Sequence, residues 1–288
     1  KEITIPYQTN VIGKNAFENC TSLETIYLNK FIDEDRPNEE MTGAVTVANE
    51  AFKGCVSLKI IDNCQRLTTV GRESFAGCTS LETIDLSGLA VSYDRAFAGC
   101  TGLKNLIMSE YTDPATNMFA GCTSLESMTY PMNYVADGMF AGCVNLADIT
   151  FTGNLTYIGA NAFEGAAISS VTVSAGNVTI GQNAFKDCKN LVSFDIGADA
   201  RVSFDGIRPF EGCDAFTAFT VAADNAYHSA ANGILFNKSK TAVSVIPEGL
   251  TDVTIPSGVT EIGSNVFSGK TNLESVTLGG ITKIGDYA

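Results

Sequence analysis

Apolar positions along the chain recur in one repeated phrase, seen in residues 70–86 as VGRESFAGCTSLETIDL. In the second half of the phrase, apolar residues alternate with polar ones at Leu81, Ile84 and Leu86, which predicts a short strand with one buried face. The first half, a small residue followed by Phe, predicts a short helical turn. A second apolar pair before the next Phe, such as Leu155 with Ile158, predicts another extended stretch.

The phrase recurs about every 22 residues, so the chain is a repeat array. Two intervals are longer; we attribute the first to an insertion and the second to a hidden, degenerate repeat. A single coil of this size cannot bury its own apolar face, and stacked coils share one core. The repeat phenylalanines are Phe17, Phe52, Phe75, Phe97, Phe119, Phe140, Phe163, Phe185, Phe210 and Phe267.

The position two residues after the repeat Phe predicts a backbone with positive φ. Eight of the ten copies have Gly there, and the other two have Asn19 and Asp187. Glycine, followed by Asn and Asp, is the residue type that best tolerates the left-handed region. We expect this residue to cap the predicted helical turn.

The cysteines follow the same period, since eight of the nine lie three residues after the Phe. Disulfides or a metal site are one interpretation. However, the paired C-x-x-C spacing of structural zinc is missing from the array, and Ala166 and Lys270 replace Cys at the same phase. We expect buried, reduced thiols that act as small core residues.

These motifs resemble the BspA-like subclass of leucine-rich repeats, whose consensus carries the Ala-Phe-x-x-Cys-x-x-Leu-x-x-Ile phrase. The resemblance implies an α+β repeat solenoid, a right-handed coil with short strands on one face and short helical turns. It also implies a secreted or surface-anchored protein of bacteria, or of some parasitic protists, that adheres or binds to host proteins, other cells or polysaccharide. Residues 222–247 look like a variant insertion of this family, and we expect a hairpin around residues 237–240.

We expect one solenoid over residues 1–288, with insertions near 31–43 and 222–247. Both ends of the sequence fall partway through a repeat, which predicts that the natural protein continues in at least one direction.

Charge, apolar run length and missing motifs argue against several classes of function. The net charge is −14 with no basic block, which argues against nucleic-acid binding. No segment has the length of apolar sequence needed to span a membrane. The single histidine, His228, lies in a loop-like segment without a G-x-S-x-G elbow, and no phosphate-binding loop is present, so we expect no enzymatic activity and no cofactor.

The candidate binding face is the exposed side of the strand ladder, where Ser and Thr predominate. A shallow polar groove for an extracellular protein or polysaccharide is one interpretation. A merely soluble, strand-compatible face is the other, in which case the repeats act as a spacer that holds another domain away from the cell. The candidate residues are Thr25, Tyr27, Asn29, Thr83, Asp85, Asn105, Asp148, Thr150, Thr172 and Asp195.

The acidic stretch at residues 33–40 offers dense oxygen ligands that could hold calcium. It lacks the spacing and central glycine of an EF-hand, and a solvated acidic loop is the favoured interpretation.

Overall fold

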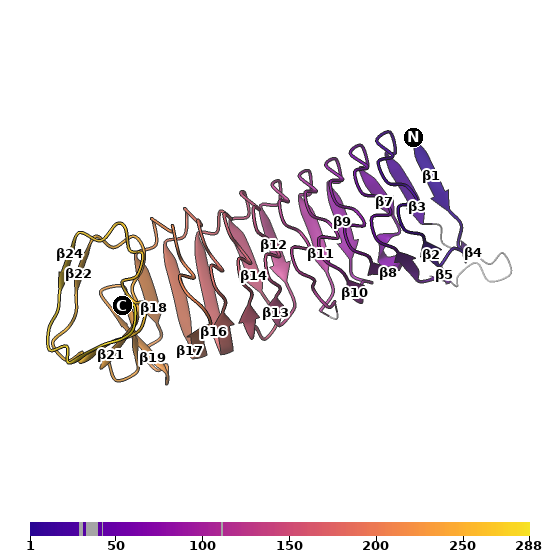
Figure 1. Cartoon of the computed structure of the whole chain (residues 1–288). Helices are drawn as coiled ribbons and strands as arrows, with labels where there is room; N and C mark the ends of the chain where they lie inside the picture. Colours follow the sequence, from indigo (N-terminus) through magenta and orange to yellow (C-terminus); the bar gives the residue numbers. More distant parts are fainter. Residues whose placement is uncertain (29–30, 33–39, 42, 111) are drawn as a thin grey trace. The chain divides into compact units, whose positions relative to one another are not determined.

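The computed structural model describes residues 1–28, 31–32, 40–41, 43–110 and 112–288, and it forms two compact units, Lys1–Gly153 and Asn154–Ala288. Each unit is a β-solenoid, in which successive coils contribute parallel strands that lie side by side (Figure 1). Over the described residues the chain makes about 12 turns and is about 1% helical.

In unit 1, a first strand column and a second strand column occupy different sides of each coil. The first strand column contains β1 (Glu2–Ile5), β3 (Thr25–Leu28), β7 (Ile60–Asp62), β9 (Thr83–Leu86), β11 (Asn105–Met108), β12 (Ser127–Tyr130) and β14 (Asp148–Phe151). The second strand column contains β2 (Val11–Ile12), β6 (Val45–Val47), β8 (Leu67–Val70), β10 (Val91–Ser92) and β13 (Tyr134–Val135). Between them lie a short hairpin of β4 (Phe31–Ile32) and β5 (Glu40–Met41) and the 3-10 helix η1 (Cys64–Arg66).

Unit 2 repeats this plan, with two longer strands, β16 and β17. Its elements are β15 (Tyr157–Ile158), β16 (Ser170–Ile180), β17 (Ser193–Phe204), β18 (Ala218–Val221), β19 (His228–Ala231), β20 (Ile234–Asn237), β21 (Ala242–Val245), β22 (Asp252–Thr254), β23 (Glu261–Ile262), β24 (Ser275–Thr277) and β25 (Lys283–Ile284). Because β16 and β17 run through both columns, they share one parallel ladder with a register shift between Val173 and Ala175.

The predicted strands and their period are confirmed. Ile84 and Leu86 of β9 are fully buried and pair in register with Leu106 and Met108 of β11, 22 residues further along. Parallel pairing one repeat apart places equivalent apolar residues in one shared core, as the alternating pattern requires.

The expected helical turns are wrong, and the fold is not α+β. In all ten copies, the residue two positions before the repeat Phe has positive φ, as does the residue two positions after it. A left-handed residue on both sides of the Phe prevents the continuous right-handed backbone that an α-helix needs. We call the residues between and including these two positions a turn segment, for example residues 73–77.

Backbone hydrogen bonds show what the turn segments do instead. Their N–H groups alternate between two partners. Phe75 N–H donates to the Ala96 carbonyl of the next coil at 2.8 Å, whereas Ala76 N–H donates back to Glu73 in its own coil at 3.1 Å. In residues 73–77, three of the five N–H donors therefore extend a ladder to the next coil. The predicted left-handed position after the Phe is confirmed, and its N–H is one of these three donors.

The repeat Phe rings form continuous stacks in the core. In unit 1, the ring centroids of consecutive repeat phenylalanines, from Phe17 to Phe140, are 5.1–5.9 Å apart, and the ring planes are nearly parallel. In unit 2, Phe163, Phe185 and Phe210 stack at 5.4 and 5.6 Å. Offset parallel stacking of this kind adds to the energy of apolar burial.

The cysteines are free thiols, and eight of the nine are buried while Cys20 is exposed. The prediction of reduced core thiols is thus confirmed except for the burial of Cys20. The buried thiols of the repeat position also have a role that was not predicted. Seven of the eight buried cysteines, all except Cys64, donate the S–H to the carbonyl of a repeat Phe in the preceding coil, as Cys100 does to Phe75 at 3.2 Å. Burial raises the pKa of the Cys100 and Cys143 thiols to about 12, so they remain protonated donors at neutral pH.

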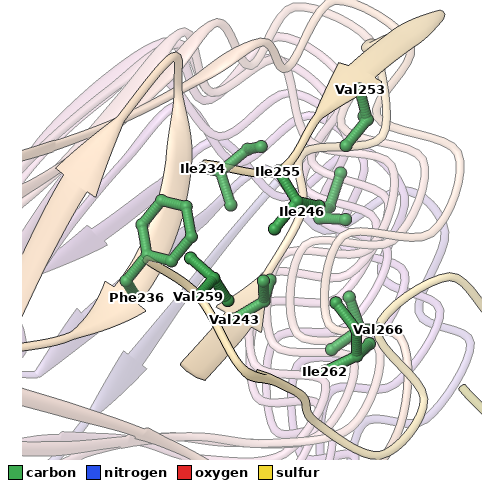
Figure 2. Packing of buried hydrophobic residues seen from close by; sticks show 9 residues of the cluster. All are labelled: Ile234, Phe236, Val243, Ile246, Val253, Ile255, Val259, Ile262 and Val266. Atoms are coloured by element: carbon green, nitrogen blue, oxygen red, sulfur yellow. The ribbon is translucent and has the colours of Figure 1, made fainter. Parts of the chain in front are cut away.

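The predicted hairpin in unit 2 is confirmed by the antiparallel pairing of β20 with β21, and β19 adds a third antiparallel strand. β20 and β21 contribute Ile234, Phe236 and Val243 to a buried hydrophobic cluster, which is shown in Figure 2. The cluster consists of Ile234, Phe236, Val243, Ile246, Val253, Ile255, Val259, Ile262 and Val266. This region has strands but no turn segment between Phe210 and Phe267.

Candidate binding face

The strand face is the outward side of the first strand column, and most of the predicted binding residues lie on it. Thr83 of β9 pairs in register with Asn105 of β11, and both are exposed. Tyr27 of β3 lies between Thr4 of β1 and Asp62 of β7 and is partly exposed. Side chains at equivalent positions of successive coils thus form rows across the face.

The remaining predicted residues of unit 1 differ in their accessibility. Asp148 and Thr150 of β14 are both exposed. Thr25 is only 8% exposed, so it offers little surface to a partner. Asn29 lies outside the described residues.

In unit 2, Thr172 of β16 and Asp195 of β17 are neighbours in register, and Thr220 of β18 continues the row. The hydroxyl of Thr220 donates to one carboxylate oxygen of Asp195, and Ser193 donates to the other at 3.3 Å. The carboxylate is therefore held in place by its neighbours on the face.

Asp85 in unit 1 is held similarly. Gln65 donates to its Oδ2 at 2.7 Å, and the backbone N–H of Ser87 donates to its Oδ1 at 2.9 Å. Partial burial opposes ionisation of Asp85, but the hydrogen bonds from Ser87 and Gln65 outweigh it and lower its pKa. The face thus presents fixed negative charges at neutral pH.

The strand face of unit 1 is hollowed between β11 and β12. β11 pairs with β9 and β12 pairs with β14, and across the described residues no strand ladder joins β11 to β12. A groove of about 500 Å³ lies there. It is lined by Lys104, Asn105, Leu106, Ile107, Ser124, Glu126 and Ser127.

Two exposed apolar side chains also lie on this face. Ile107 in the groove is 53% exposed and Ile60 on β7 is 54% exposed. Both occupy outward positions that are Thr, Ser or Asp in most other coils, and that departure from the repeat is the sequence signal that identifies them. Single exposed aliphatic residues are common on protein surfaces, so Ile107, which lines the groove, is the candidate anchor for a partner.

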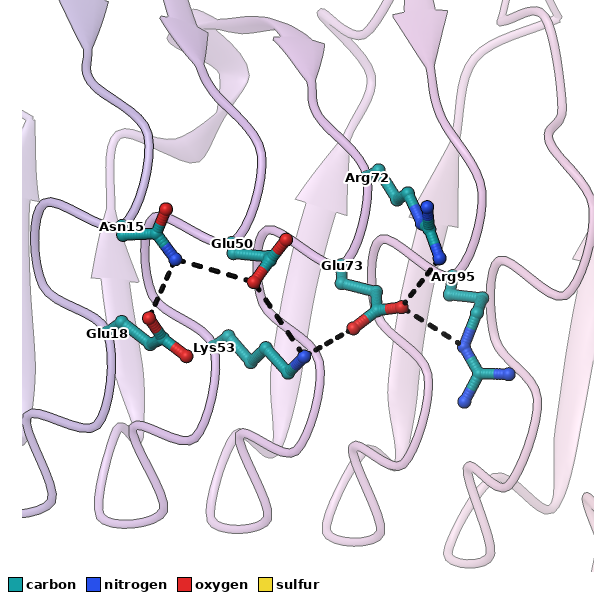
Figure 3. Close-up of polar contacts among 7 residues, drawn as sticks. All are labelled: Asn15, Glu18, Glu50, Lys53, Arg72, Glu73 and Arg95. Atoms are coloured by element: carbon teal, nitrogen blue, oxygen red, sulfur yellow. Dashed lines mark hydrogen bonds and ion pairs between the residues drawn. The ribbon is translucent and has the colours of Figure 1, made fainter.

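A charged network lies on the turn side of unit 1, away from this face (Figure 3). Glu73 accepts a hydrogen bond from Lys53 at 2.6 Å, and Arg72 and Arg95 lie 3.5 and 3.7 Å from its carboxylate. The hydrogen bond from Lys53 is the main cause of the lowered pKa of Glu73. The network consists of Asn15, Glu18, Glu50, Lys53, Arg72, Glu73 and Arg95, and it links side chains of successive turn segments.

Among the described residues, no three His, Cys, Asp or Glu side chains gather in an arrangement that could hold a metal ion. The acidic stretch at residues 33–39, considered above for calcium, lies outside the described residues. No helix in the described part of the chain has the length and apolar character to cross a membrane.

The chain matches the BspA type leucine-rich repeat region, in six copies, over residues 1–36, 41–134, 112–231 and 247–288. It belongs to the BspA-type leucine-rich repeat family. The family assignment made from the Ala-Phe-x-x-Cys phrase is therefore confirmed, even though this BspA-type chain has turn segments where helical turns were expected. None of the curated proteins matches it.

Two solved structures share the fold of this BspA-type chain. A leucine-rich repeat protein from Bacteroides ovatus is 19% identical with a TM-score of 0.54, and the match covers 99% of this chain and 82% of that one. A leucine-rich cell surface protein from Faecalibacterium prausnitzii is 23% identical with a TM-score of 0.51, and the match covers 99% of this chain and 65% of that one.

Proposed function

We propose that this chain is a non-enzymatic binding module of a bacterial cell-surface protein, and that its strand face binds an extracellular protein or polysaccharide. Membership of the BspA-type repeat family supports a binding role, because repeat proteins use extended faces of stacked coils for recognition. The cell-surface protein of F. prausnitzii, which shares the fold, supports the location.

The proposal rests on one observation: around β11, the strand face departs from the rows of Ser and Thr found in most other coils. A spacer needs only a soluble face, and the Ser and Thr rows provide one. The groove between β11 and β12, with Ile107 exposed beside Lys104 and Glu126, instead combines an apolar centre with charged edges. Apolar anchors surrounded by polar groups are the usual composition of a protein recognition site.

The test is binding of the purified chain to immobilised extracellular matrix proteins, mucins and bacterial polysaccharides, measured by surface plasmon resonance. The informative variant is Ile107→Thr, because Thr129 and Thr150 occupy the equivalent position in later coils and the fold accepts threonine there. Val144→Thr is the matched control, since Val144 is 52% exposed but lies off the first strand column.

We expect saturable binding to at least one partner, weakened about tenfold or more by Ile107→Thr and unchanged by Val144→Thr. Equal loss in both variants would assign the effect to general surface hydrophobicity rather than to the groove. Absence of binding to every partner would overturn the proposal and favour a spacer that positions another domain.

A further inference from the structure

A cavity of about 440 Å³ lies within unit 2, where the hairpin interrupts the stack of turn segments. The turn segment at residues 208–212 and the one at residues 265–269 are separated in sequence by the coil that carries β19, β20 and β21. That coil contributes strands but no repeat Phe and no turn segment. The cavity lies beside Phe210, the last ring of its stack, and its volume is in the range of small-molecule sites.

The spacing of the glycines shows how the stack is interrupted. A Cβ added to Gly77, Gly99 or Gly121 would lie 3.7–3.9 Å from the backbone of the equivalent glycine one coil earlier. A Cβ added to Gly269 would instead lie 2.8 Å from the guanidinium carbon of Arg208. The Arg208 side chain thus extends across the space that a turn segment fills elsewhere.

The guanidinium of Arg208 has few partners for its donors. The guanidinium has five N–H donors. Among the described residues its side chain makes one hydrogen bond, from Nη1 to Glu211 at 3.4 Å. Its Nε is buried with no acceptor. A buried donor without an acceptor is costly. A planar guanidinium fork is suited to bidentate binding of a carboxylate.

The other charges of the cavity neutralise each other. Lys270 replaces the core cysteine of its repeat, and its Nζ lies 2.8 Å from Glu248 Oε1, with both side chains at most 10% exposed. Arg208 is the other positive charge among the lining residues, and Glu211, 3.4 Å from its Nη1, contacts one side of its guanidinium. The buried Nε still has no acceptor, and a guanidinium N–H can donate to a carboxylate but offers nothing to a cation.

The remaining polar lining is rich in hydroxyl and amide groups, from Ser244, Ser264, Asn265 and Ser268, beside apolar Phe204 and Val266. Hydroxyl and amide side chains both donate and accept hydrogen bonds, as recognition of a polyhydroxylated ring requires. A carboxylate-binding group and a hydroxyl-binding wall thus occur together in one cavity.

We propose that this cavity binds a hexuronic acid unit, with its carboxylate at Arg208 and its hydroxyls at the serine and asparagine side chains. The site is independent of the strand face, because its lining residues do not include the row of Thr172, Asp195 and Thr220. It can bind a ligand even if the strand face does not.

The test is isothermal titration of the full chain with D-glucuronate and D-galacturonate, beside D-glucose and D-galactose as neutral sugars and acetate as a bare carboxylate. The informative variant is Arg208→Asn, because Asn183 and Asn265 adopt the same left-handed backbone at the equivalent position. Arg95→Asn is the matched control, since Arg95 occupies that position in unit 1. Circular dichroism verifies that both variants are folded.

We expect saturable binding of at least one uronate, with the matching neutral sugar and acetate about tenfold weaker or more. Arg208→Asn should weaken uronate binding about tenfold or more, and Arg95→Asn should leave it unchanged. Absence of uronate binding up to about 20 mM would overturn the proposal. So would equal affinity for neutral sugars, equal affinity for acetate, or an Arg208→Asn variant that binds like the wild type.

Discussion

The stacked phenylalanines predict a graded loss of stability that depends on position in the stack. Phe119 is fully buried between Phe97 at 5.6 Å and Phe140 at 5.9 Å. Truncation of a buried Phe to Ala costs about 3–5 kcal/mol, through lost burial and the cavity left behind. Phe119→Leu keeps most of the apolar volume and loses two ring contacts of about 0.5–1.5 kcal/mol each, so we expect it to cost about 1–3 kcal/mol in the free energy of unfolding.

Phe17 provides the internal comparison because, within the described part of the chain, its ring stacks on Phe52 alone, at 5.1 Å, and it is partly exposed. Phe17→Leu therefore loses one ring contact and should cost about 0.5–1.5 kcal/mol. Urea denaturation followed by far-ultraviolet circular dichroism measures all three variants. A loss below about 1 kcal/mol for Phe119→Ala, or equal losses for the two leucine variants, would refute the stacking argument.

Three further predictions follow from the core thiols, the hairpin and the turn segments. At pH 8, Ellman's reagent should react rapidly with Cys20 alone in the native protein and with nine thiols after denaturation; a lower final count would reveal crosslinks. His228 Nε2 accepts the N–H of Val202 at 3.0 Å, and burial, with a smaller contribution from Arg201, lowers its pKa. His228 therefore takes up a proton less readily in the folded protein than in the unfolded chain. Because the unfolded chain binds that proton first, the free energy of unfolding should fall as pH drops from 7 through the ordinary histidine pKa of about 6.5. Urea melts of His228→Gln, which can accept the same bond without titrating, should show a smaller pH dependence, and an unchanged slope would contradict this. Gly121, with φ of 74°, should tolerate Asn better than Ala, and Gly121→Ala should cost about 1–2 kcal/mol in the same melts; equal costs would exclude backbone strain as the cause.

The sequence was sufficient to predict the repeat, its period, the strands and the left-handed position after the Phe, because glycine occupies that position in eight of ten copies. The left-handed position before the Phe was missed. There the chain uses Glu50, Glu73 and Arg95 as well as asparagines, and charged residues give little sign of positive φ. The asparagines were the available signal, and the hydrogen bonds that stabilise this conformation come from the next coil.

The candidate site was predictable to a lesser degree. Alternation along each strand identified which side chains point outward, so Thr83 and Asn105 were placed together correctly. The groove beside Ile107 depends on whether adjacent strands pair, and the cavity at Arg208 depends on a turn segment that the hairpin coil lacks. Both are properties of the register between coils, which no single repeat encodes.

The alternating donors of the turn segments have a mechanical consequence. Within a unit, the hydrogen bonds that join one coil to the next, such as Phe75 N–H to Ala96, run between neighbouring coils rather than within one. A pulling force applied at one chain end therefore loads the bonds of the outermost coil before those of the next. Each 22-residue coil that detaches should lengthen the chain by roughly 75 Å, and extension of a unit by optical tweezers should proceed in a series of such steps.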